Sequence, residues 1–111
     1  MSGIPKRFQA FMDKHPEVAK GYNALGDAVH RAGPLDEKTR ALIKLGISTG
    51  ARLEGAVHSH ARKALAAGVT VDEMKHAVIL ALPTIGLPSM MAALSWIDDV
   101  LEKERPQERK R

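Results

Sequence analysis

The chain has 111 residues, which suffices for one domain with a modest hydrophobic core. It contains no cysteine, which excludes disulfides, thiolate catalysis and cysteine-bound zinc. The net charge is +4, but half of this excess falls between Glu102 and Arg111, so we expect no nucleic-acid interface.

The apolar runs of the chain are too short for a membrane protein. The polar first residues, interrupted by Pro5, do not resemble a signal peptide. A span needs about 20 apolar residues, and the longest run, from Ala77 to Ile85, is interrupted by Pro83. We therefore expect a cytoplasmic protein with no membrane partner.

Helical periodicity and cap signals predict an all-α fold of about six helices, because no strand alternation is present. Pro16 suits a first helical position, and Thr70 with Glu73 has the spacing of a capping box. We expect the fourth and fifth helices to form an antiparallel hairpin. Residues 1–101 should form a single domain, followed by a charged, flexible tail over 102–111. The expected helices cover residues 5–14, 16–32, 37–50, 53–67, 70–82 and 88–103.

The fourth predicted helix carries the most distinctive candidate side chain. His60 falls on an apolar stripe of small and aliphatic residues, whereas His58 is predicted to face outward. A buried imidazole needs hydrogen-bond partners. His60 is therefore either a core histidine bonded to a backbone carbonyl or a general acid or base in a small pocket. The stripe consists of Leu53, Ala56, Val57, His60, Ala61, Ala64 and Ala67.

His58 shares a helix face with Glu54 and Arg62. This face is either a surface ion-pair network or a subunit contact, where Glu54 orients His58 or acts with His60. His58 and His60 cannot chelate one metal ion, because they lie about 200° apart on a helix. Glu54 and His58 could supply two ligands, with His76 or another subunit giving a third. We nevertheless expect no metal site and no cofactor.

Three segments occur in an order that resembles a known family: LDEKTRALIKLGIS from Leu35, HARKALAAGVTVDEM from His60, and the Gly-Leu-Pro turn at Gly86. The chain resembles the carboxymuconolactone decarboxylase family, which includes the alkylhydroperoxidase D-like proteins. The resemblance covers about residues 35–101 and implies a helical bundle that assembles as trimers or hexamers. A core poor in aromatic side chains also favours a homo-oligomer.

The redox branch of that family uses a Cys-x-x-Cys-x-x-x-His motif with a glutamate upstream. When His60 is aligned with the motif histidine, Leu53 and Ala56 occupy the cysteine positions and Ala41 occupies the glutamate position. Only the histidine carries over. Because a thiolate is the nucleophile in that chemistry, peroxidase activity is the disfavoured alternative.

The resemblance and the candidate residues together predict a decarboxylase-like or lyase-like protein. We expect His-based acid-base chemistry on a small organic acid or lactone, with His60 as the catalytic residue and Glu54 and His58 in support. Arg52, just before the fourth helix, is the candidate for binding a substrate carboxylate, unless it is an exposed loop residue. The substituted motif positions leave a further alternative, a non-catalytic small-ligand-binding or assembly protein.

Overall fold

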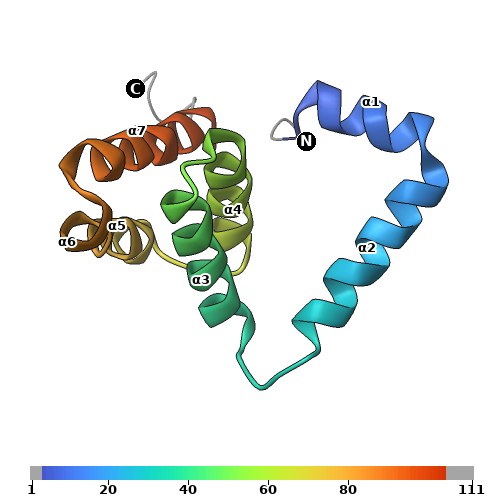
Figure 1. The fold of residues 1–111 in the computed structure, drawn as a ribbon, viewed down its shortest axis with the longest axis horizontal. Helices are drawn as coiled ribbons and strands as arrows, with labels where there is room; N and C mark the ends of the chain where they lie inside the picture. The colour runs from blue at the N-terminus through green and yellow to red at the C-terminus, as the bar shows by residue number, and fades with distance from the viewer. Residues whose placement is uncertain (1–3, 105–111) are drawn as a thin grey trace. The chain divides into compact units, whose positions relative to one another are not determined.

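The computed structural model describes residues 4–104, and in this range the chain is helical with no strand (Figure 1). The all-α class is confirmed. None of these helices is long and apolar enough to cross a membrane. The helices are α1 (Lys6–Lys14), α2 (Pro16–His30), α3 (Glu37–Gly50), α4 (Glu54–Ala66), α5 (Val71–Ile79), α6 (Leu82–Ile85) and α7 (Leu87–Glu104).

The described chain divides into two compact units, of which the first ends at Asp36. This unit holds α1 and α2, where Phe8 meets Tyr22 edge to face with ring centroids 6.4 Å apart. No residue of either helix is buried. Two helices cannot enclose a core, so their apolar side chains stay exposed. These side chains are Phe8, Phe11, Val18, Tyr22, Leu25 and Val29.

The second unit begins at Glu37 and encloses a hydrophobic core between α3, α4, α5 and α7. The helices α3 and α4 run side by side in opposite directions (Figure 1). The helix α4 packs more extensively against α3 and α7 than against α5, which follows it through the short connection over residues 67–70. The fully buried side chains at the centre are Leu45, Val57, Ala61, Ala64, Met74, Val78, Ala93 and Ile97.

The end of α4 is closed by Gly68, as its sequence position predicts. Gly68 has a φ of +91°, a left-handed conformation that glycine adopts without steric cost. Its N–H donates to the carbonyl of Leu65 at 3.0 Å, and the N–H of Val69 donates to the carbonyl of Ala64 at 2.9 Å. This is a Schellman motif. It turns the chain so that Val69 is buried against the core.

The region between α5 and α7 differs from the prediction. The helix α5 ends at Ile79 instead of near residue 82, and Pro83 lies in the first turn of the separate short helix α6. Proline is compatible with a first turn because its missing N–H has no helical partner there. The helix α7 continues through Glu104 and so includes the first residues of the predicted tail. The rest of that tail, 105–111, lies outside the described residues.

The predicted capping box at the start of α5 is present. The N–H of Glu73 donates to Thr70 Oγ1 at 3.0 Å, and the N–H of Thr70 donates to Glu73 Oε1 at 2.9 Å. The backbone hydrogen bond from Thr70, with Lys38 nearby, lowers the pKa of the Glu73 carboxyl below its usual value. The box fixes the direction in which α5 leaves the connection after α4.

Replacing Thr70 by Ala should lower the free energy of unfolding by about 1 kcal/mol, because the N–H of Glu73 loses its acceptor. Urea denaturation monitored by circular dichroism measures this change. Thr70→Ser keeps the hydroxyl and should stay close to the wild type. An equal loss in both variants would contradict the capping role.

The stability that the Glu73 carboxylate contributes depends on pH. Because the pKa of Glu73 is lowered on folding, this contribution is present above pH 4.5 and is lost as the pH falls through the folded pKa.

Candidate functional site

The helix α4 carries the predicted catalytic residues on two different flanks. Val57, Ala61 and Ala64 face the core and are fully buried. His58 and His60 lie on either side of this stripe, and both are partly buried. The prediction that His60 points inward and His58 outward is therefore corrected, because the buried stripe is narrower than expected. Leu53, assigned to that stripe, is 55% exposed.

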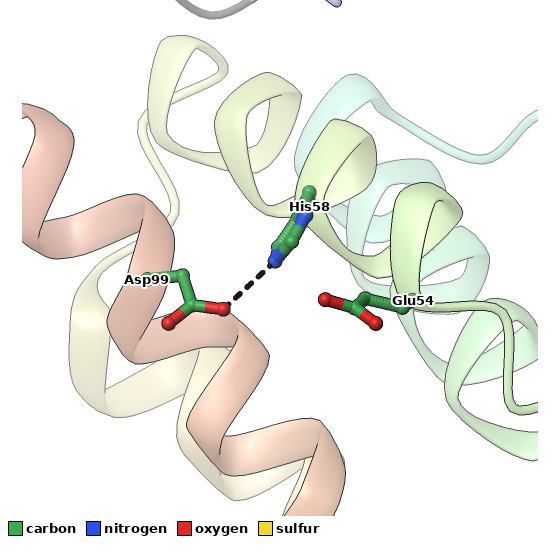
Figure 2. A group of neighbouring side chains, drawn as sticks. All are labelled: Glu54, His58 and Asp99. Atoms are coloured by element: carbon green, nitrogen blue, oxygen red, sulfur yellow. Dashed lines mark hydrogen bonds and ion pairs between the residues drawn. The ribbon is translucent and has the colours of Figure 1, made fainter.

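The first flank of α4 faces α7 (Figure 2). The Nε2 atom of His58 lies 3.1 Å from Asp99 Oδ2, and Glu54 approaches from one helical turn earlier on α4. One nitrogen or oxygen atom from each of the three side chains lies within 4.8 Å of the others. The sequence predicts the Glu54–His58 pairing from its spacing. It does not predict Asp99, because the two helices that meet here are far apart in the sequence.

Arg62, predicted to share this face, forms no ion pair within 4.0 Å of Glu54 or Asp99 in the part of the chain that the structure describes. The basic side chains near this flank pair with other acids. Lys75 Nζ, for example, is 3.4 Å from an oxygen of Asp98, the neighbour of Asp99. Of the two acids on this flank, Asp99 pairs with the imidazole of His58, which is charged only when protonated.

The second flank of α4 faces α3 and is basic. Lys63 lies one turn after His60, and Arg40 and Lys44 lie one turn apart on α3. The pKa of Lys44 is lowered from its usual value, first by partial burial and then by the positive charges of Lys63 and Arg40. The three cations therefore gather across the α3–α4 contact. We call Arg40, Lys44 and Lys63 the basic seam.

The α3–α4 hairpin brings His60 to a height similar to that of Lys44 in the basic seam. Lys44 and His60 are equally distant in sequence from Arg52, which lies at the centre of the turn between the antiparallel helices α3 and α4. They therefore stand at a similar height on facing helices. The spacing of Arg40 and Lys44 on one helix face is visible in the sequence. Their proximity to Lys63 requires the hairpin register, which the sequence analysis did not assign.

Arg52 has a backbone role that the sequence analysis did not foresee. It has a φ of 60° and occupies the position after α3 that Gly68 occupies after α4. Its N–H donates to the carbonyl of Thr49, and the N–H of Leu53 donates to the carbonyl of Ser48, both at 3.1 Å. Its side chain is exposed at the turn. The structure thus brings Arg52 to the end of the hairpin that holds the basic seam.

A separate open groove of about 370 Å³ lies between α3 and α5. Its walls are mainly apolar, with Glu73 and His76 as the titratable groups. None of the four predicted site residues lines it. The groove residues are Leu42, Ile43, Gly46, Glu73, His76, Ala77 and Leu80.

The fold and these two flanks define a small all-α protein whose histidine-bearing helix contacts two neighbouring helices. A model described as the carboxymuconolactone decarboxylase family matches residues 16–99, so the chain belongs to this family. The match begins at Pro16, before the segments that carry the resemblance, and includes α2. It ends at Asp99, the partner of His58.

An uncharacterized protein of Haemophilus influenzae is a curated relative of this chain. The two are 35% identical over 63 residues, which cover 57% of this chain and 56% of the relative. The chain therefore matches little more than half of that protein's length. No solved structure matches the chain.

The two left-handed turn residues allow a direct test of the helix ends. Gly68→Ala should lower the free energy of unfolding by about 1 kcal/mol, because a Cβ is disfavoured at positive φ. No atom beyond its immediate neighbours lies within 4 Å of that Cβ, so the cost comes from the backbone alone. Arg52→Gly should retain or increase stability, because Arg52 has a positive φ that glycine adopts without steric cost. Thermal unfolding followed by circular dichroism measures both changes.

Gly55→Ala is the matched control, because Gly55 also has free space around it but lies within α4 without a positive φ. This substitution should leave stability unchanged or raise it by up to about 1 kcal/mol. If Gly68→Ala were as stable as Gly55→Ala, the left-handed closure of α4 would be refuted.

Proposed function

We propose that the chain binds a small organic acid or lactone acid at the basic seam and transfers a proton to or from it through His60. The observation that carries this proposal is the crowding of Arg40, Lys44 and Lys63 on the flank of α4 that bears His60. A bound carboxylate would offset the positive charge that Lys63 and Arg40 exert on Lys44. Guanidinium and ammonium groups are also the usual partners of carboxylates in proteins.

Decarboxylation of a lactone acid or β-keto acid leaves an electron pair on the carbon that loses carbon dioxide, and a proton must replace the lost group. In the proposed mechanism, protonated His60 donates this proton, a task suited to imidazole because its usual pKa lies near neutrality. The cations of the seam stabilise the negative charge that develops on the substrate oxygen. Family membership supports this class of reaction for the chain.

The other predicted site residues take different places in this proposal. Glu54 and His58 lie on the flank of α4 opposite His60, so the proposed proton transfer does not use them. Arg52 lies at the end of the α3–α4 hairpin, where an extended acid that reaches beyond the seam meets its exposed guanidinium. Peroxidase chemistry by a dithiol is not proposed, because the 111 residues contain no cysteine.

We further propose that the chain forms a homo-oligomer, such as a trimer or hexamer, through apolar side chains that the described chain leaves exposed. Ile43 and Ile47 lie one turn apart on α3 and are 45% and 64% exposed, and Leu80 on α5 is 62% exposed. Apolar surface concentrated beside a groove is typical of subunit contacts. The exposed stripe of α1 and α2 offers a second apolar surface for such an assembly.

His60→Gln should lower turnover by about 10²- to 10⁴-fold, because glutamine cannot transfer the proton. Release of carbon dioxide from carboxymuconolactone and from a panel of β-keto acids measures this. His76→Gln is the matched control, since His76 lies on α5 away from the seam. Unchanged turnover in His60→Gln would refute the catalytic role.

Binding of the same acids by calorimetry separates catalysis from ligand binding alone. Lys63→Gln should weaken binding, whereas Lys75→Gln, which removes a cation that pairs with Asp98, should not. Acid binding without carbon dioxide release from any panel member would instead support the non-catalytic alternative.

Ile47→Glu should convert the assembled protein to smaller species, because a buried carboxylate without a partner is unfavourable in an apolar interface. Light scattering coupled to size-exclusion chromatography measures the molar mass. Thr84→Glu introduces the same charge at an exposed position of α6 and should keep the assembly intact. A wild-type protein that is monomeric at all concentrations would contradict the assembly proposal.

A further inference from the structure

The flank of α4 that faces α7 carries a donor set that the proposed acid-base chemistry does not use. Glu54 and His58 stand one turn apart on α4, and Asp99 approaches them from α7 (Figure 2). His58 Nε2 and Asp99 Oδ2 are 3.1 Å apart, and one donor atom of each residue lies within 4.8 Å of the other two. The three side chains thus point toward one common space.

These distances suit a single metal ion. Zinc binds histidine nitrogen and carboxylate oxygen at about 2.0–2.2 Å, so two ligands of one tetrahedral ion are about 3.4 Å apart. The His58–Asp99 separation is already close to this value. The widest pair must approach by at most about 1.4 Å, which the exposed side chain of Glu54 can provide by rotating about its own bonds.

The charge of the cluster also favours a cation. Within the described residues, neither Glu54 nor Asp99 has a lysine or arginine within 4.0 Å. The adjacent Asp98 differs, because Lys75 pairs with it at 3.4 Å. Two carboxylates and a neutral imidazole together carry a charge of −2, which a divalent ion neutralises.

The backbone beneath the cluster is held by the core. Val57 and Ala61 on α4 are fully buried, as is Ile97 on α7, and Val100 is nearly so. These residues lie within three positions of His58 or Asp99 and fix the separation of the two helices. Ion binding therefore requires rearrangement of side chains only, with little movement of the backbone.

We infer that Glu54, His58 and Asp99 bind one divalent transition-metal ion of the Zn²⁺, Co²⁺ or Ni²⁺ class. The imidazole nitrogen favours these ions over Ca²⁺ and Mg²⁺, which prefer sites built of oxygen ligands alone. Three protein ligands leave at least one coordination position for water. The expectation of no metal site changes because α7 supplies the third ligand within the same chain.

This site is independent of the acid-base proposal, because His58 and His60 lie on opposite flanks of α4. Metal binding can therefore be present or absent whatever the outcome of the turnover experiments. The inference needs neither an identified substrate nor an active enzyme.

Titration of the chelator-treated full chain with Zn²⁺ in a calorimeter tests the inference. We expect saturable binding of one ion per chain, weakened at least tenfold in His58→Gln, Asp99→Asn and Glu54→Gln. Asp98→Asn is the matched control, since it changes a neighbouring carboxylate outside the cluster. Absence of saturable binding, or equal binding by Asp98→Asn and Asp99→Asn, would overturn the inference.

A second measurement uses the wild-type chain alone and so does not depend on the folding of any variant. Co²⁺ is paramagnetic, and substoichiometric amounts should broaden the ring signals of His58 in NMR spectra before those of His15, His30, His60 and His76. Earlier broadening of any other histidine would place the ion elsewhere and contradict the assignment.

Discussion

The close packing of α4 between α3 and α7 is the constraint on which both candidate sites depend. Its buried stripe consists of Val57, Ala61 and Ala64, and such small side chains let neighbouring helices approach closely. A larger side chain at Ala61 or Ala64 would move α3 or α7 outward. The close packing of α3 and α7 against α4 therefore follows from the small size of the residues between them.

The two flanks of α4 have opposite electrostatic character. On one side, Lys63 and Arg40 bring positive charge close to Lys44, and His60 lies one turn before Lys63 on α4. On the other side, Glu54 and Asp99 place carboxylates around His58. An imidazole beside cations and an imidazole beside carboxylates favour different ligands, namely an anion in the first case and a cation in the second. One helix can thus support two separate chemistries, because its core-facing stripe keeps the histidines apart.

Local signals in the sequence predicted most helix boundaries, since caps and turns depend on near neighbours. The Thr70–Glu73 box and the left-handed Gly68 are examples, and family membership was recognisable from segments of α3, α4 and α5. The sequence did not predict Asp99 as the partner of His58 or the gathering of the basic seam. Both depend on which helices lie side by side, and helical periodicity within one element does not contain that information. The left-handed conformation of Arg52 was not predicted either, because glycine is the usual residue at the position it occupies.

The central claim is that His60 and the basic seam form an anion site distinct from the carboxylate cluster at His58. The most direct measurement is an NMR titration of the histidine ring signals of the assembled wild-type chain with a small dicarboxylate such as succinate. We expect saturable shifts of the His60 ring signals and little change in those of His58. Shifts of His58 without shifts of His60, or no saturable change at either ring, would contradict it.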